Sequence, residues 1–211
     1  MASKKENALF SQRLAAYLFD VIIISMVVSF ITFPFYDNTS VEKLSRSNSE
    51  LVEKYMNKEI DTNTYFVESV NLSYELTRKN GVISLVTIFL NVLYFICFQF
   101  KNSGQTIGKK LMHIQVVSND DSELTINNMI FRSMIINTIL VDILTFAFML
   151  FASKTVSFIL SGVFGICGYL LILISLLMVM FSKESRGLHD IIANTKVVKD
   201  NGVKELEVCE N

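Results

Sequence analysis

Four long apolar stretches divide the chain and predict membrane-spanning helices. They cover residues 14–36, 81–100, 129–151 and 158–181. Each is close to the roughly 20 residues that an α-helix needs to cross the hydrocarbon core of a bilayer. Because that core offers no water to the backbone, each stretch should form a helix that satisfies its own hydrogen bonds. The pattern therefore predicts an all-α polytopic membrane protein built around a four-helix transmembrane bundle.

The polar segments between and beside these stretches are residues 1–13, 37–80, 101–128, 152–157 and 182–211. Lysine and arginine occur in the first, third and last of them, and the short segment 152–157 contains only Lys154. Segment 37–80 has six basic residues against eight acidic ones, which weakens this asymmetry without reversing it. An excess of these two residue types marks cytoplasmic segments. We therefore expect both chain ends and segment 101–128 in the cytoplasm, the other two segments outside, and the protein in the cell membrane.

Segment 37–80 carries two helical patterns. Apolar residues recur at helical intervals in its first half, at Val41, Leu44 and Leu51, and again over residues 64–79. Asp61-Thr62-Asn63 between them is a turn signal. We expect an extracellular helical hairpin in this segment.

Segment 101–128 contains a β-strand pattern. His113-Ile114-Gln115-Val116-Val117 alternates in polarity and includes β-branched residues, as a half-buried strand does. Leu124-Thr125-Ile126 is a candidate return strand, and residues 194–199 form a further strand-like run. We expect a small cytoplasmic β-ribbon of two or three strands.

Composition narrows the functional classes. Hydrophobic residues make up 51% of the chain, charged residues 18%, and the net charge is −1. The apolar content excludes a disordered chain, and the net charge gives no reason to expect a nucleic-acid partner. His113 and His189 are the only histidines, and no nucleophile elbow, phosphate loop or metalloprotease motif occurs. We therefore predict that the protein is not an enzyme and binds neither a cofactor nor a metal.

Ionisable residues within the apolar stretches are the candidate functional residues. Asp20 lies in the first stretch, and Arg132 and Asp142 lie in the third. A charge near mid-bilayer costs about 2.5–3.5 kcal/mol on insertion scales, so such residues persist where they pair or line a polar path. Asn91 and Thr138 belong to polar rows that can face Asp20 in a bundle. We assign Asp20, Asn91, Thr138 and Asp142 to a candidate ion or proton pathway.

Helix geometry predicts how these charges pair. Arg13 and Asp20 share a helix face, but two turns, or about 10.5 Å, separate them. We expect Asp20 to pair with Arg132, and Arg13 to bind lipid phosphates or Asp190. Asp142 has no basic partner at its depth, so it should be protonated or accept hydrogen bonds from asparagine and threonine. As an alternative to a pathway, the same charges can simply hold the helices together.

Three motifs resemble those of the RDD family of membrane proteins. They are QRLAAYLFD at residues 12–20, GQTIGKKL at 104–111 followed by IQVV, and GLHDIIANTKVV at 187–198. The family is named for one arginine and two aspartates, which match Arg13, Asp20 and Asp190, and Arg132 also fits the family pattern. Ile107 departs from it, since proline is common at that position. The resemblance runs from about residue 8 to 199 and implies a transport role, with sodium/proton exchange proposed for some members.

Two functions of different classes follow. The first is exchange of a monovalent cation or proton through Asp20 and Asp142, in a bundle small enough that a homo-oligomer is expected. The second is a non-transporting membrane adaptor or scaffold. Its basic cytoplasmic face, with Lys109 and Lys110, would dock a partner or the anionic lipids of the bilayer.

Overall fold

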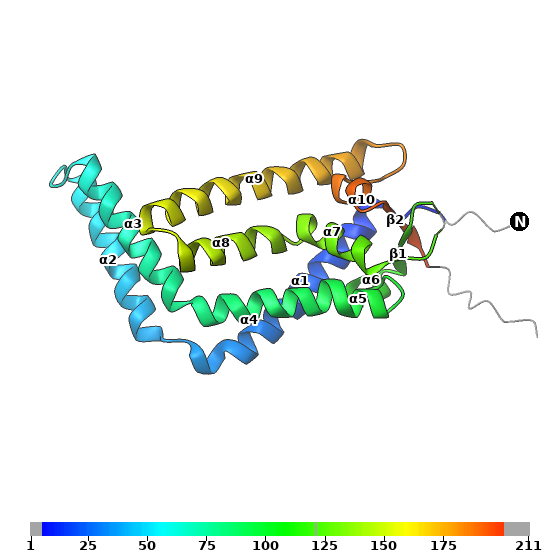
Figure 1. Cartoon of the computed structure of the whole chain (residues 1–211), viewed down its shortest axis with the longest axis horizontal. Helices are drawn as coiled ribbons and strands as arrows, with labels where there is room; N and C mark the ends of the chain where they lie inside the picture. The colour runs from blue at the N-terminus through cyan, green and yellow to red at the C-terminus, as the bar shows by residue number, and fades with distance from the viewer. Residues whose placement is uncertain (1–5, 121, 201–211) are drawn as a thin grey trace, which may run out of the picture. The chain divides into compact units, whose positions relative to one another are not determined.

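The computed structural model describes residues 6–120 and 122–200, and most of these residues are helical (Figure 1). Within that part of the chain, three helical stretches are long and apolar enough to cross a membrane: Phe10–Phe35, Gly81–Lys101 and Lys154–Phe181. A fourth span exists if the helix pair Ile126–Ile136 and Ile139–Phe151 crosses as one broken segment. These helices are those of a multi-pass membrane protein.

The chain forms two compact units, each assembled from segments that are distant in sequence. The first unit comprises Met1–Met26, Asn91–Asn137 and Leu170–Asn211, and the second comprises Val27–Leu90 and Thr138–Tyr169. Helices α1 (Phe10–Thr32) and α9 (Lys154–Phe181) each contribute to both units.

The first unit contains the short elements of the fold. Besides its parts of α1 and α9, they are a π-helical stretch at Leu93–Phe98, α5 (Gln99–Lys101), α6 (Ile107–Leu111), β1 (Ile114–Ser118), α7 (Ile126–Ile136), α10 (Leu188–Ile192) and β2 (Thr195–Lys199). All three motifs of the sequence, at residues 12–20, 104–117 and 187–198, fall in this unit.

A two-stranded antiparallel sheet joins two of those motifs. β1 pairs with β2 in a register that sets Val116 opposite Val197, and both of these valines are 1% exposed. The start of the described chain lies along the other edge of β2, where Asn7 bridges Val198 and the Ala8 amide donates to the Val197 carbonyl at 3.0 Å. The sheet thus ties the N-terminal segment, segment 101–128 and the C-terminal segment together.

The expected return strand at Leu124-Thr125-Ile126 is wrong. Thr125 instead caps α7, forming a capping box in which its side chain and that of Asn128 bond reciprocally to each other's backbone amides. Threonine three residues before an amide acceptor is a helix start signal, and it prevails here over the β-branched character of the segment. β1 therefore pairs with the strand near the C-terminus.

The second unit contains the two helices expected in segment 37–80. They are α2 (Asn38–Met56) and α3 (Thr62–Lys79), and each begins with an aspartate cap, Asp37 for α2 and Asp61 for α3. An aspartate oxygen that accepts a backbone N–H satisfies one of the four unpaired donors at a helix start. The unit is completed by η1 (Phe33–Phe35), most of α4 (Gly81–Val92), α8 (Ile139–Phe151), and its parts of α1 and α9.

The third apolar stretch is not one continuous helix. It is broken after Asn137, and Thr138 adopts a left-handed backbone conformation with φ 53°. That conformation costs a residue with a side chain about 1–2 kcal/mol relative to glycine. The expected continuous helix over residues 129–151 is therefore replaced by α7 and α8.

Candidate functional site

Asp190, at the start of α10, is the centre of a buried ion-pair cluster in the first unit. The carboxylate is fully buried. Nη1 of Arg13, from α1, donates to its Oδ2 atom at 3.1 Å, and Nη1 of Arg132, from α7, donates to its Oδ1 atom. The hydroxyl of Thr195 also donates to Oδ1, at 3.3 Å. One carboxylate thus joins α1, α7, α10 and β2.

The expected pair between Asp20 and Arg132 is wrong. Arg132 binds Asp190, and Arg13 also binds Asp190, one of the two partners expected for it. That pair is expected if Asp20 and Arg132 lie at a similar depth in straight membrane helices. The short helix α10 brings Asp190 to the same two arginines, and Asp20 is occupied by other donors.

Asp20 is 1% exposed and receives three hydrogen bonds from uncharged groups. The hydroxyl of Tyr94 donates to Oδ1 at 2.6 Å, and the hydroxyl of Thr106 donates to Oδ2 at 2.5 Å. The backbone amide of Gly108 donates to Oδ1 at 2.8 Å. Asp20 therefore fixes the GQTIGKK segment against α1.

Glycine is required at position 108 by this contact. A Cβ atom there would lie 2.1 Å from the backbone oxygen of Ala16 and 2.8 Å from Oδ1 of Asp20. Gly104, at the other end of the motif, has φ +78°, and a Cβ there would lie 2.2 Å from the Val116 oxygen. The two glycines allow the loop to approach α1 and β1 closely.

His189 links the Asp190 cluster to α9. Its Nδ1 atom lies 2.5 Å from the hydroxyl of Ser175, and its Nε2 atom lies 3.5 Å from Oδ2 of Asp190. The order of these three side chains is that of a hydrolytic triad, but the Ser175 side chain is fully buried and its hydroxyl also accepts the His189 amide at 3.3 Å. Ser175 therefore anchors α10 on α9.

Burial lowers the pKa of His189 well below its ordinary value, and the charges of Arg132, Arg13 and Lys109 lower it further. The imidazole is therefore neutral at pH 7. The neutral His189 adds no positive charge to this region. The charge balance is therefore set by Arg13, Arg132 and Lys109 against the carboxylates of Asp20 and Asp190.

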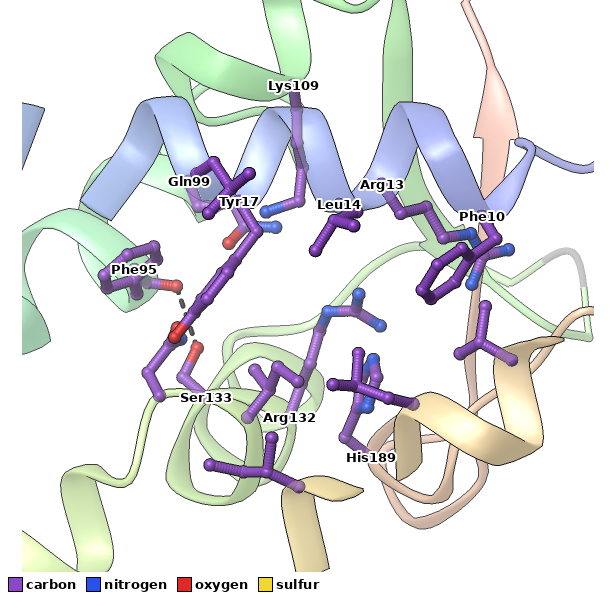
Figure 2. Close-up of a pocket in the computed structure, with 16 residues that line it drawn as sticks. Phe10, Arg13, Leu14, Tyr17, Phe95, Gln99, Lys109, Arg132, Ser133 and His189 are labelled. Carbon is purple, nitrogen blue, oxygen red and sulfur yellow. Dashed lines mark hydrogen bonds between the residues drawn. The ribbon is translucent and has the colours of Figure 1, made fainter. Parts of the chain in front are cut away.

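A cavity of about 170 Å³ lies beside the Asp190 cluster, entirely within the first unit. Figure 2 shows Lys109 and Arg132 turning toward its middle from opposite sides, with Arg13 and His189 at one end. The rest of the wall is mainly apolar and includes Leu14 and Leu18 from α1, Phe95, and Ile172, Leu176 and Val179 from α9. The cavity therefore combines three cationic side chains with a mainly apolar wall.

Lys109 and Lys110 differ in their surroundings although they are adjacent. Lys109 is partly buried and lines the cavity, whereas Lys110 is exposed. Within residues 6–120 and 122–200, the Nζ atom of Lys109 donates one long hydrogen bond, 3.5 Å, to the hydroxyl of Thr106. Burial lowers the pKa of Lys109 to about 7, and the charge of Arg132 adds to this effect. Its ammonium group is thus the least well compensated charge on the wall.

The residues assigned to a pathway are distributed over both units. Asp20 and Asn91 belong to the first unit, and Thr138 and Asp142 belong to the second. Thr138 donates a long hydrogen bond, 3.5 Å, to the carboxylate of Asp142. Among the described residues, no group of three or more histidine, cysteine, aspartate or glutamate side chains could hold a metal ion.

The model of the RDD family matches residues 7–194, and this range includes Arg13, Asp20, Arg132 and Asp190. The chain belongs to the RDD family. A search of curated proteins and a search of solved structures each return no match. In this RDD protein, Arg13, Asp20 and Asp190, which the motif resemblance matches to the family name, all take part in hydrogen bonds of the first unit.

Sequence reasoning missed several members of the site. Thr106 and Ser175 are neutral, so no search for charges would select them, although Thr106 lies between the two glycines of a recognised motif. Adjacent side chains on a helix point in different directions, so the sequence does not predict a contact between His189 and Asp190, yet the His189 ring lies 3.5 Å from the Asp190 carboxylate. A neutral hydrogen-bond donor close to a motif glycine, such as Thr106, is the sequence signal that could have identified these members of the site.

Proposed function

We propose that this RDD protein is a docking protein of the cell membrane, whose first unit binds an anionic group in its cavity. This is the adaptor function of the two that the sequence suggests. The charge pattern of the flanks favours a cytoplasmic position for both chain ends and for the basic segment that carries Lys109. The proposal assigns the chain no catalytic role.

The observation that carries this proposal is the charge of the cavity wall. Arg13, Arg132 and Lys109 supply three cationic side chains, and the neighbouring carboxylates are those of Asp20 and Asp190. One positive charge is left unbalanced when Lys109 is protonated. An anion at this position would remove the cost of the buried charge, since opposite charges favour each other's ionised forms.

The same wall disfavours a cation in this cavity. A cation near Lys109 and Arg132 meets like charge, which a partly dehydrated site screens weakly. The carboxylates of the cluster are also occupied, Asp190 by two arginines and Asp20 by three uncharged donors. A cation that displaced these donors would have to dismantle the contacts that hold α6 and α10.

The proposal is tested by anion-dependent thermal stability. The full chain is purified in neutral detergent, and its Tm is measured with phosphatidylglycerol, with inorganic phosphate, and with sodium chloride at matched ionic strength. We expect an anionic phosphate group to raise the Tm of the wild type and of Lys110→Gln, and to have little effect on Lys109→Gln. If every probe shifts the three proteins equally, the cavity binds no anion.

Exchange of a monovalent cation or proton is a second candidate, favoured by the break in the third apolar stretch. The first turn of α8 directly follows the left-handed Thr138, and Asp142 lies in that turn. In secondary transporters, coupling ions bind at broken membrane helices, and a carboxylate there is a usual ligand. An oligomer would supply further walls for such a path in so small a protein.

Proteoliposome flux tests this second candidate. A pH gradient should drive Na⁺, Li⁺ or K⁺ uptake by the wild type, and Asp142→Asn should abolish it. Asp61→Asn, which alters a helix cap in α3, is the control for nonspecific damage. Uptake no greater than in protein-free liposomes, or uptake unchanged by Asp142→Asn, would remove the candidate.

A further inference from the structure

The cavity has a second property besides its charge, because its apolar wall continues onto the outer surface of a membrane helix. Leu14 and Leu18 line the cavity, and they are also 38% and 53% exposed. Both belong to α1, whose exposed apolar side chains face acyl chains when the helix lies in a bilayer. The apolar surface of α1 therefore extends from its lipid-facing side to the cavity that Lys109 and Arg132 line.

The opposite wall repeats this arrangement on α9. Ile172, Leu176 and Val179 line the cavity at helical spacing, whereas Leu173, one residue from Ile172, is 53% exposed. On α9, therefore, one row of apolar side chains faces the cavity and the neighbouring row faces lipid. A ligand that touches both α1 and α9 must be apolar along its length and anionic at the end that reaches Lys109.

We propose that the cavity is a binding site for one anionic phospholipid, whose phosphate lies between Lys109 and Arg132 and whose first acyl carbons lie against Leu14, Leu18 and Leu176. This rests on the proposed anion-binding function and names the ligand class for the same site. Basic pockets between membrane helices on the cytoplasmic side are known to take lipid headgroups. A soluble phosphate or carboxylate would satisfy the charge but leave the apolar walls unfilled.

The size of the cavity agrees with a headgroup and not with a whole lipid. A water molecule needs roughly 10–15 Å³ of cavity volume, and the cavity offers about 170 Å³. That space admits a phosphate group with a few carbons. The remainder of both acyl chains would lie on the exposed surface of α1, where Leu18 already presents apolar area.

The charges that face Lys109 come from every element around it. α1 contributes Arg13 and Asp20, α7 contributes Arg132, and α10 contributes the neutral His189. Arg13 and Arg132 are already bound to Asp190, and the side chains of both are nearly buried, with 11% and 7% exposed. Lys109, in contrast, forms no ion pair within the described residues, so its ammonium group can bind a phosphate without giving up a carboxylate partner.

Lipid retention measured by native mass spectrometry tests this proposal. The full chain is reconstituted in nanodiscs of phosphatidylcholine with a minor fraction of phosphatidylglycerol, then released and weighed with its bound lipids. We expect the wild type to retain one phosphatidylglycerol in preference to phosphatidylcholine. Loss of one phosphate-binding cation near the surface corresponds to about a fivefold loss in affinity, so Lys109→Gln should lower retention at least about fivefold.

Two matched controls distinguish the cavity from the general surface. Lys110→Gln removes the same charge from an exposed position and should retain the lipid as the wild type does. Leu176→Trp fills the apolar wall and should lower retention, whereas Leu173→Trp adds the same side chain to the lipid-facing row and should not. The Leu176 variant leaves every charge in place, so it tests the site even if Lys109→Gln folds poorly.

The outcomes separate this inference from the function on which it rests. If inorganic phosphate protects the wild type as well as phosphatidylglycerol does, and protection depends on Lys109, the cavity binds a soluble anion and the lipid assignment is overturned. If neither probe binds, the anion-docking function itself fails. Equal loss of lipid in Lys109→Gln and Lys110→Gln would assign retention to the basic surface and overturn the cavity site.

Discussion

Replacing Asp190 by asparagine should destabilise the protein strongly. The substitution leaves the shape almost unchanged, but it removes the only carboxylate to which both Arg13 and Arg132 are bound at ion-pair distance in the described structure. Asp190 is fully buried. Removing one partner of a buried ion pair costs about 3–5 kcal/mol, mainly because the other charge is left uncompensated. Here two charges lose their partner, so we expect Asp190→Asn to fall within or above that range.

The assay is thermal unfolding of the purified full chain in a fixed detergent. For a chain of this size, 1 kcal/mol corresponds to about 2–4 °C in Tm, so Asp190→Asn should lower the Tm by at least about 6 °C. Asp142→Asn is the matched control, because among the described residues the Asp142 carboxylate accepts one long hydrogen bond, from Thr138 at 3.5 Å. We expect less than about 2 °C from the control.

A double-mutant cycle tests the pairing itself. Once Asp190→Asn is present, Arg132→Gln should cost little more, or should restore stability, because it removes a charge that no longer has a partner. The coupling of Arg132 with Asp190 should exceed its coupling with Asp20. An Asp190→Asn protein with the wild-type Tm, or a larger coupling of Arg132 with Asp20, would refute the assignment of the network.

Three further changes test other parts of the structure by the same Tm assay. Gly108→Ala should cost at least about 2 kcal/mol, because the new Cβ would lie 2.1 Å from the Ala16 oxygen and would overpack the contact, whereas Gly165→Ala, with nothing within 4 Å, should be neutral or stabilising. Equal effects of the two would contradict the close docking of α6. Thr138→Gly should raise stability by up to about 1 kcal/mol, since glycine adopts the left-handed conformation without strain, and a loss of stability would argue against the break as described. Burial lowers the pKa of Lys109 from 10.5 to about 7 in the folded protein. Between these two pH values the unfolded chain binds more protons than the folded protein, so the stability of the lipid-free protein should rise with pH above 7. The rise should be smaller in Lys109→Gln, and identical pH profiles would contradict the buried position of the lysine.

The fold was largely predictable from the length of the apolar stretches. Residues 81–100 and 158–181 carry no charge, and a helix of that length is the simplest structure that a bilayer permits. The two helices of segment 37–80 were equally predictable, since Asp61 marks the turn between two periodic stretches and caps the second. Each of these features depends on residues that are close together in the sequence, so the sequence alone predicts them.

The break at Thr138 was not predictable in the same way. The chain's only proline is Pro34, far from the break, and kinks are normally attributed to proline or glycine. Thr138 takes a conformation that β-branched residues avoid. The surrounding structure must supply the free energy for it, and that contribution is not visible in the residues themselves.

The partners of Asp20 show why the site was only partly predictable. If the helices are straight, depth along them pairs Asp20 with Arg132. The actual donors, Tyr94, Thr106 and Gly108, are 74 to 88 residues away and uncharged. Thr106 and Gly108 reach Asp20 through the sharp loop that begins at Gly104, and Tyr94 reaches it from the π-helical stretch. These contacts therefore follow from tertiary structure. The partnership of Arg13 with Asp190 was accessible because both residues belong to motifs that carry formal charges.

The difference between Lys109 and Lys110 also required the structure. In the sequence they form one basic pair, and either could face a partner. The five-residue helix α6 is capped by Thr106, and this start sets the phase that turns Lys109 into the cavity and Lys110 outward.

The central claim, that a phosphate occupies the cavity, is tested most directly by the distance between the Lys109 nitrogen and lipid phosphorus. Solid-state NMR can measure the ¹⁵N–³¹P dipolar coupling in the full chain labelled at lysine side chains and reconstituted with phosphatidylglycerol. We expect one lysine signal to show the strong coupling of a hydrogen-bonded pair, and to disappear in Lys109→Gln while persisting in Lys110→Gln. Absence of any such coupling, or its persistence in Lys109→Gln, would contradict the account.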